Sequence, residues 1–196
     1  PLRHEPNQKF EYSNFGYFLL SMLVEEVSGQ TLREYAHKNM FKPLGMHNTF
    51  FSDDPVEIIK NRASGYKRTK SGGYVTDMTN LFWVGDGGLH TNLDDMLIWD
   101  RHFYEPKLGK DPKALIKLMN TANSEHKAKG LYYANGQFIG EKDGQTFFSH
   151  SGGWLGTLTY YARYPEKRFS LAMMCNNASL NMGDYLDDVV EAFMEE

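Results

Sequence analysis

The stretch Phe147-Phe148-Ser149-His150-Ser151-Gly152-Gly153-Trp154-Leu155-Gly156 is the part of the sequence around which the rest can be ordered. An aromatic run leads into a polar His-Ser pair, and glycines then remove side chains, so that backbone N–H groups can approach a ligand closely. We predict a strand edge that presents hydrogen-bond donors to a developing negative charge. A glycine-rich turn between two strands is the alternative that this stretch leaves open.

The sequence around this stretch has the two-residue period that is typical of strands. We predict strands over Tyr132–Ile139, Gln145–Ser151, 158–164 and 169–175, with a turn at 165–168 between the last two. A hairpin or two needs further strands or a covering layer to be stable. We therefore expect the sheet to be incomplete, with the missing strands supplied by residues ahead of Pro1.

A terminal helix is predicted after the sheet, because apolar residues recur there at helical spacing. One side of this helix carries Met182, Leu186, Val189, Val190 and Phe193. Such a helix can cover one face of the sheet.

Helix signals dominate the sequence before residue 131. Apolar residues at steps of three and four from Phe15 to Val27 predict a helix with one buried stripe, which Ser13 or Asn14 caps and Gly29 ends. A capping box at 31–34 opens a second helix, which must stop before Pro43.

Further elements follow in the same half of the chain. A short strand is predicted around 73–76, after a turn-rich segment. Thr91 is predicted to cap a helix that runs to about Tyr104, with Asp94 and Asp95 in its first turn, where negative charge is favoured. Another helix is predicted through 114–119.

These elements predict an α+β fold in which helices come first, an antiparallel sheet second and one helix last. The 196 residues, 41% of them hydrophobic, suit one domain. We predict a single, incomplete domain over 1–196, with a mainly helical or irregular region over about 1–130 and the sheet with its terminal helix over about 131–196. Since the sequence does not begin with Met, we expect it to be part of a longer polypeptide.

Composition argues against several classes of function. A net charge of −4 and a pI near 6.0 favour neither nucleic acid nor a membrane surface as partner. No apolar run approaches the roughly 18 residues of a membrane span. The seven histidines form no metal-ligand spacing, so no metal and no cofactor are predicted. The single cysteine, Cys175, lies in an apolar strand pattern that is typical of a small buried hydrophobe.

Two Ser-x-x-Lys spacings are candidates for a nucleophile with its lysine: Ser64 with Lys67, and Ser124 with Lys127. On a helix this spacing places a lysine beside a serine, where it lowers the barrier to deprotonation. Neither serine is followed by an apolar helix that would hold it rigidly. We therefore expect neither to be the nucleophile.

Tyr12-Ser13-Asn14 is the second stretch that indicates chemistry. It lies at the start of a predicted helix, which would point a phenol and a carboxamide the same way. A core tyrosine beside an ordinary helix cap is the alternative reading of these residues.

Together these motifs resemble the serine β-lactamase and penicillin-binding-protein superfamily, in particular its class C-like branch. That branch includes class C β-lactamases, D-aminopeptidases and family VIII esterases. Residues 10–17 resemble the second motif and its helix, and 43–49 resemble the Pro-Leu-Gly-Met segment after it. Residues 87–99 resemble a later Gly-Gly-Leu helix. Residues 150–153 resemble the third motif, with His150 where many relatives carry lysine.

The resemblance implies roles for individual residues. Tyr12 would be the general base in acylation, which requires a neighbouring cation because a free phenol has a pKa of about 10. Asn14 would bind the amide or ester arm of the substrate. His150 would replace the third-motif lysine and interact with Tyr12 or a substrate carboxylate. The N–H of Gly153 would be one oxyanion-hole donor. Ser151 and Gly152 would line the substrate site.

The implied function is acyl transfer through a serine acyl-enzyme, as in β-lactamases, esterases and D-peptidases, on small ester, amide or peptide substrates. Because a neutral imidazole holds a carboxylate less firmly than lysine does, we favour esters or peptides over penicillins. The nucleophile would lie outside this chain, in a missing N-terminal segment or another chain. The alternative is a non-catalytic relative that binds a peptidoglycan-like or acyl ligand. The cell envelope or periplasm is implied by analogy alone.

Overall fold

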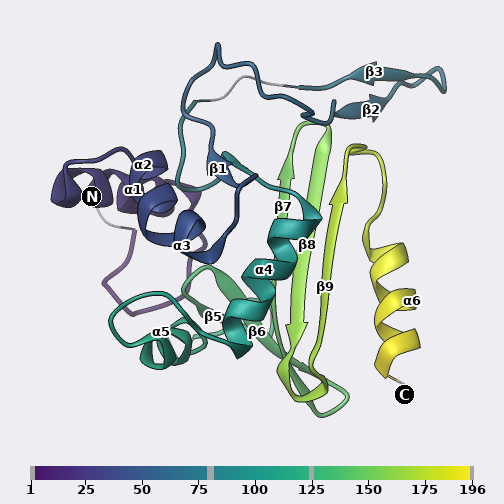
Figure 1. Cartoon of the computed structure of the whole chain (residues 1–196). Helices are drawn as coiled ribbons and strands as arrows, with labels where there is room; N and C mark the ends of the chain where they lie inside the picture. Colours follow the sequence, from purple (N-terminus) through teal and green to yellow (C-terminus); the bar gives the residue numbers. More distant parts are fainter. Residues whose placement is uncertain (1–2, 79–81, 124–125, 195–196) are drawn as a thin grey trace. The chain divides into compact units, whose positions relative to one another are not determined.

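The computed structural model describes residues 3–78, 82–123 and 126–194. The chain forms two compact units. Unit 1 comprises Pro1–Ile58 and Asn80–Ala128, and unit 2 comprises Ile59–Thr79 and Lys129–Glu196. Figure 1 shows the elements of both units.

Unit 1 is mainly helical. Its helices are α1 (Asn14–Ser28), α2 (Leu32–Ala36), a π-helical turn (His37–Phe41), α3 (Lys42–Leu44), α4 (Leu93–Tyr104) and α5 (Pro112–Met119). Two short antiparallel strands, β1 (Phe50–Phe51) and β4 (Leu89–His90), pair with each other.

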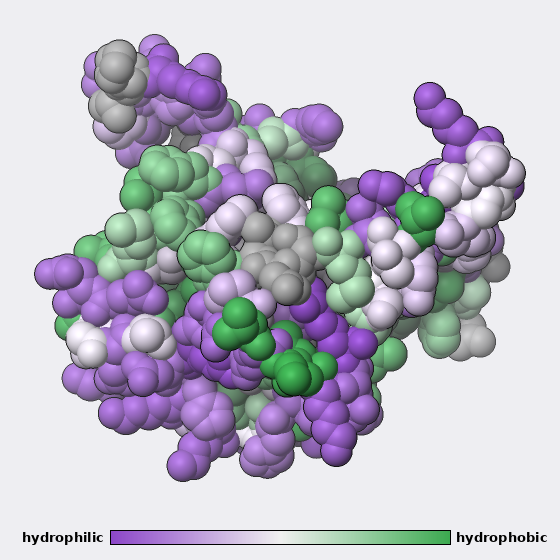
Figure 2. Space-filling view, turned by 90° about the horizontal axis from the view of Figure 1, so that it is seen from above, coloured by the Kyte–Doolittle hydropathy of each residue, from purple (hydrophilic) through white to green (hydrophobic). Residues whose placement is uncertain are grey.

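Helix α1 has the ends that the sequence predicts but not the predicted buried stripe. The Ser13 side chain accepts a hydrogen bond from the N–H of Gly16, and Gly29 ends the helix in the left-handed conformation. Phe15 and Val27 are 67% and 79% exposed. Apolar residues are also visible at the surface in Figure 2, in green. The side of α1 that packs carries Ser21 instead, which is buried and donates to the carbonyl of Val84 at 2.8 Å.

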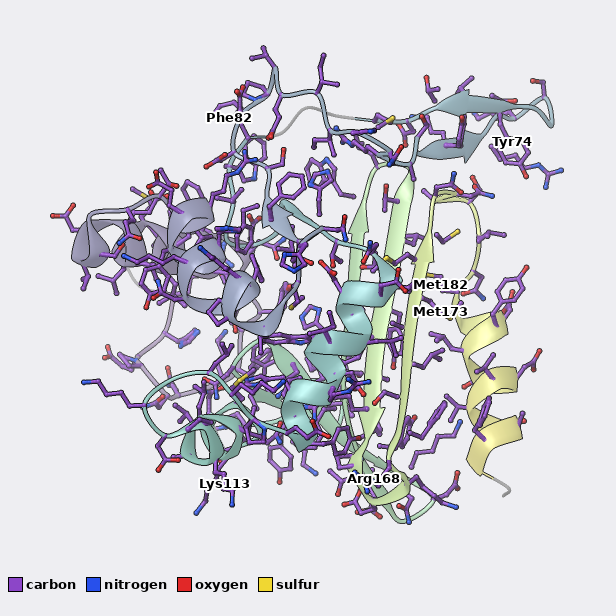
Figure 3. The ribbon with its side chains drawn as sticks, in the orientation of Figure 1. Tyr74, Phe82, Lys113, Arg168, Met173 and Met182 are labelled. Carbon is purple, nitrogen blue, oxygen red and sulfur yellow. The ribbon has the colours of Figure 1, made fainter. Side chains whose placement is uncertain are left out.

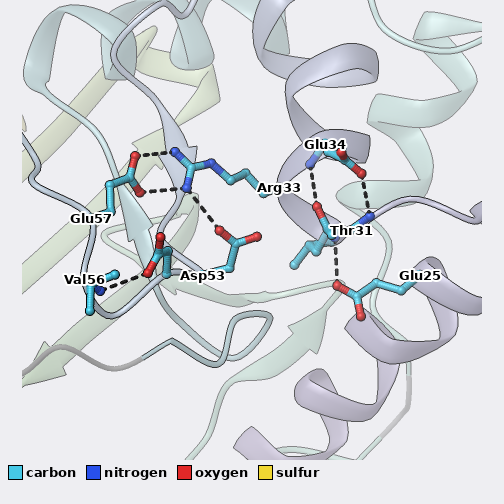
Figure 4. Close-up of polar contacts among 9 residues, drawn as sticks. Glu25, Thr31, Arg33, Glu34, Asp53, Val56 and Glu57 are labelled. Carbon is cyan, nitrogen blue, oxygen red and sulfur yellow. Dashed lines mark hydrogen bonds and ion pairs between the residues drawn. The ribbon is translucent and has the colours of Figure 1, made fainter.

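The capping box of α2 is confirmed (Figure 4). Arg33, in the same helix, makes two 2.7 Å hydrogen bonds to Glu57 and one of 3.1 Å to Asp53. The prediction that helical structure stops before Pro43 was wrong. Pro43 lies in the first turn of α3, where a missing N–H costs no hydrogen bond.

A buried carboxylate joins α4 to the segment that precedes β1. Asp95 is 3% exposed and accepts hydrogen bonds from the backbone N–H of Asn48 at 2.8 Å and the Thr49 hydroxyl at 2.7 Å. Asn92, and not Thr91 as predicted, caps α4, because its side chain accepts from the N–H of Asp95. The Thr91 hydroxyl instead lies 2.7 Å from that of Thr49.

Unit 2 is built on a five-stranded antiparallel sheet with the order β5-β6-β7-β8-β9. The strands are β5 (Tyr132–Ala134), β6 (Gln137–Lys142), β7 (Gln145–Trp154), β8 (Thr157–Tyr164) and β9 (Phe169–Cys175), and helix α6 (Gly183–Met194) follows. A separate hairpin pairs β2 (Tyr66–Arg68) with β3 (Tyr74–Thr76), and Tyr74 near its tip is labelled in Figure 3. The predicted α+β class, with an antiparallel sheet and a closing helix, is confirmed.

The predicted single strand over 132–139 was wrong. Asn135 and Gly136 have positive φ angles of 48° and 93°, and the pair Ala134–Gln137 flanks them. An Asn-Gly pair is the preferred sequence of the two-residue type I′ turn, which fits the twist of a hairpin. The segment therefore folds back on itself as β5 and β6.

The core of unit 2 lies between the sheet and α6. Ala162 and Tyr164 of β8 are buried with Val190 of α6. The Phe169 and Phe193 rings stack with centroids 5.0 Å apart. Figure 3 shows Met173 and Met182 on the side of β9 where α6 lies, and Arg168 in the turn that joins β8 to β9. Among the described residues, none of the helices has the length and apolar character to cross a membrane.

The Asp95 network gives a stability prediction. Replacing Asp95 with Ala removes a buried charged acceptor from two donors, and we expect the free energy of unfolding to fall by about 3 kcal/mol. Asp94→Ala is the matched control, since Asp94 lies in the same helical turn but is exposed. It should cost less than about 1 kcal/mol, the loss of a charge near a helix N-terminus. Urea unfolding measures both, and equal losses would contradict the role given to Asp95.

Candidate active site

Tyr12 and Asn14 lie together at the start of α1 in unit 1. Asn14 is the first residue of the helix, and Ser13 between them is its cap. Both Tyr12 and Asn14 are exposed. The start of the helix is thus fixed by hydrogen bonds while the two candidate side chains stay at the surface.

A glycine loop over 85–88 packs against the same helix. Gly85 has a φ of 126°, and a Cβ placed there would lie 2.6 Å from the Ser21 side chain and 3.1 Å from the Tyr17 carbonyl. Only glycine allows this close approach. The loop carries Asp86, whose carboxylate acts electrostatically on Tyr12.

The surroundings of Tyr12 in unit 1 do not activate its phenol. Burial raises the pKa of Tyr12 above its usual value near 10, and Tyr17 and the Asp86 carboxylate raise it further. A general base needs the opposite shift, which a nearby cation produces. Activation of Tyr12 would therefore require a positive charge beyond the groups that cause this shift.

The residues 150–153 lie on β7 in unit 2, near the end of the strand. The two-residue turn Leu155–Gly156 closes on the pair Trp154 and Thr157. In such a hairpin this pair exchanges hydrogen bonds, and the next pair along the strands does not. That next pair joins Gly153 and Leu158. The N–H of Gly153 therefore points away from β8.

Among the described residues of unit 2, no strand pairs with the opposite side of β7 beyond Ser149. Within the described part of unit 2, β6 pairs with β7 only from Gln145 to Ser149. Ser151 and Gly153 follow Ser149 at steps of two, so their N–H groups point to the side that β6 occupies earlier along the strand. The predicted strand edge is therefore present, and the glycine-rich turn is not at 150–153 but follows at 155–156.

Contacts on both sides of its ring hold His150 in place. Its Nδ1 lies 2.6 Å from the Ser151 carbonyl, and its Nε2 lies 3.5 Å from the Tyr133 hydroxyl. The Phe138 ring stacks on the imidazole with centroids 5.4 Å apart. Sequence reasoning missed Tyr133, which comes near β7 only because the Asn135–Gly136 turn folds β5 back.

Close packing explains why two positions of the 147–156 stretch are glycine. A Cβ at Gly152 would lie 2.3 Å from the Thr159 hydroxyl, and one at Gly156 would lie 2.3 Å from the backbone nitrogen of Tyr66. The N–H of Gly156 also donates to the Asp77 carbonyl at 2.8 Å. The turn after β7 is thus anchored to the base of the β2–β3 hairpin, which fixes the end of the strand.

The candidate site residues form two groups, one in each unit. Tyr12 and Asn14 belong to unit 1, and His150, Ser151, Gly152 and Gly153 belong to unit 2. Within the described ranges, no cluster of three or more His, Cys, Asp or Glu side chains suits a metal ion.

The Ser-x-x-Lys candidates gain no support. Ser64 precedes strand β2 instead of lying in a helix. Lys67 forms an ion pair with Asp77, at 2.9 Å. The pair therefore lacks the helical geometry that places a lysine beside a serine. Ser124 lies outside the described residues.

Comparison with known proteins shows the family. The chain matches the Beta-lactamase family over residues 1–193 and belongs to it. It is 23% identical over 178 residues to a D-aminopeptidase of Gluconobacter oxydans (strain 621H), a match that covers 91% of this chain and 33% of that protein. The chain spans about a third of the length of the curated relatives it matches.

Solved structures show the same fold. The octameric penicillin-binding protein homologue from Pyrococcus abyssi is 30% identical with a TM-score of 0.79, over 89% of this chain and 40% of that one. A penicillin-binding protein from Bacillus halodurans is 25% identical with a TM-score of 0.82, over 98% of this chain and 59% of that one. The resemblance to the β-lactamase and penicillin-binding-protein superfamily is therefore confirmed.

The environment of Tyr12 gives a titration prediction. Asp86→Asn removes a negative charge that disfavours the phenolate, so Tyr12 should ionise at a lower pH than in the wild type. Carbon NMR of the tyrosine Cζ atoms follows the titration, and the Tyr12 signal is the one lost in Tyr12→Phe. Asp94→Asn, at an exposed site on α4, is the control and should leave the Tyr12 curve in place. An unchanged curve in Asp86→Asn would show that the 85–88 loop does not act on Tyr12.

Proposed function

We propose that this chain supplies the proton-transfer and oxyanion-binding side of an acyl-transfer site in a serine hydrolase. The observation that carries the proposal is the edge of β7 beyond Ser149, where Gly153 directs its N–H away from β8, three residues after His150 on the same strand. Preorganised N–H donors of this kind stabilise the negative charge of a tetrahedral intermediate. Loss of one such donor typically lowers kcat by about 10²–10³-fold.

The substrate class we propose is an amide or ester of a D-amino acid or a short peptide that contains one. The similarity to a D-aminopeptidase supports this choice, as does a histidine in place of the third-motif lysine. Asn14 would bind the amide or ester arm, with Ser151 and Gly152 along the substrate. We propose esters or peptides, and not penicillins, as the substrates.

In the proposed reaction a serine hydroxyl attacks the substrate carbonyl. The serine gives its proton to Tyr12, which would act as a phenolate held by the missing lysine, and the oxyanion that forms accepts a hydrogen bond from the N–H of Gly153. Tyr12 then passes the proton to the leaving amine or alcohol as the carbonyl re-forms. Water next attacks the acyl carbonyl and gives a proton to Tyr12, which returns it to the serine oxygen as the acid leaves.

We propose that the serine and its lysine come from polypeptide outside residues 1–196. The absence of helical geometry at the described residues Ser64 and Lys67 and the one-third coverage of the curated relatives both support this.

A binding-only protein is the second candidate. The same raised pKa favours it, since an unactivated phenol can donate a hydrogen bond to an acyl or peptidoglycan-like ligand but is a poor base. The two candidates differ in turnover, not in the residues that contact the ligand.

The test is kinetic and uses the full-length gene product with a D-amino acid amide. Tyr12→Phe should lower kcat/KM by about 10²–10⁴-fold, the usual contribution of general acid–base catalysis. Tyr74→Phe, an exposed residue of the β2–β3 hairpin, is the control and should keep wild-type kinetics. Equal rates for wild type and Tyr12→Phe would remove Tyr12 from its role. Binding without turnover in the wild type would favour the second candidate.

A further inference from the structure

Three aromatic rings from neighbouring strands of unit 2 contact one another. They belong to Tyr133 of β5, Phe138 of β6 and His150 of β7. The Phe138 ring stacks on the imidazole at 28°, while the Tyr133 ring meets it nearly edge-on at 73° with centroids 6.1 Å apart. Tyr133 and Phe138 are themselves in T-shaped contact at 4.9 Å. These contacts restrict the plane of the imidazole.

The hydrogen bonds of His150 distinguish its two nitrogens. Nδ1 lies 2.6 Å from the Ser151 carbonyl oxygen, which can only accept. Nδ1 must therefore carry the hydrogen, and in the neutral ring Nε2 is the acceptor. The Tyr133 hydroxyl lies 3.5 Å from Nε2, beyond the usual range of about 2.7–3.2 Å, and its O–H can make only a weak hydrogen bond to this nitrogen.

We propose that Tyr133 is a positioning residue for His150, which acts in this site as the Nδ1–H tautomer with Nε2 as its proton acceptor. The single Nε2 lone pair can take a proton from a donor in the site once the Tyr133 hydroxyl has rotated away from it, and Tyr133 Oη then accepts a hydrogen bond from the new Nε2–H. The same contact thus holds the ring before and after proton transfer. The use of this proton transfer rests on the proposed function, whereas the tautomer and the Tyr133 contact do not.

The tautomer also bears on the group that His150 recognises. In the neutral ring, once Tyr133 no longer donates to it, the Nε2 lone pair attracts an N–H or ammonium donor and opposes the lone pairs of a carboxylate. The lysine found in many relatives has only donors and a positive charge. His150 is therefore assigned the amine or amide side of a substrate and not a substrate carboxylate.

The test is nitrogen NMR of the histidine side chains in the full-length gene product, at a pH where the imidazoles are neutral. The His150 signals are those that disappear in His150→Gln. We expect Nδ1 to resonate as a hydrogen-bearing ring nitrogen and Nε2 as an unprotonated one. Tyr133→Phe keeps the ring contacts but removes the hydroxyl. The chemical shift of Nε2 should therefore move towards the value of an unprotonated ring nitrogen that receives no hydrogen bond. Tyr132→Phe, one residue earlier on β5, is the matched control and should leave Nε2 in place.

Two results would overturn the inference. One is a wild-type His150 with the hydrogen on Nε2, which would exclude the assigned tautomer. The other is an Nε2 signal that responds equally to Tyr133→Phe and Tyr132→Phe, which would remove the positioning role of Tyr133. Since no turnover is measured, either result can occur whether or not the proposed hydrolase function holds.

Discussion

The two-residue turn at Leu155–Gly156 is the constraint on which the candidate site in unit 2 depends. It fixes the register of β7 against β8, and register decides which residues of β7 direct their N–H groups away from β8. If the pairing slipped by one residue, the N–H of Gly153 would point towards β8, and the N–H of Gly152 would point away from it. The close contact of Gly156 with Tyr66 and its hydrogen bond to Asp77 oppose such a slip, because the turn could not move without breaking both.

Local signals in the sequence predicted much of the fold. Helix caps depend on contacts between residues that are close in the sequence. The predicted caps at Ser13, at 31–34 and at Gly29 were each confirmed. The class of fold and the family also followed from the sequence, because motifs such as 150–153 occur in the right order along the chain. Predictions that needed packing partners failed: the α1 stripe that includes Phe15 is exposed, since helical periodicity does not say what covers a face.

Tyr133 could not be identified as a site residue without the turn at Asn135–Gly136. The sequence Asn135-Gly136 is itself a strong hairpin signal, and treating it as mid-strand placed Tyr133 far from β7. With the turn in place, Tyr133 reaches within 3.5 Å of His150 Nε2. The direction of the Gly153 N–H could not be predicted either, because it depends on pairing register, and composition alone does not determine that register. The pairing of the Tyr12 group with the His150 group remains a proposal.

We propose that residues of this chain serve a serine acyl-enzyme whose nucleophile lies outside residues 1–196. The most direct measurement is mass spectrometry of the full-length gene product after reaction with a fluorophosphonate, followed by peptide mapping. We expect one adduct, on a serine outside residues 1–196, and slower labelling in Tyr12→Phe. An adduct on Ser64 or Ser124, or none on the folded protein, would contradict it.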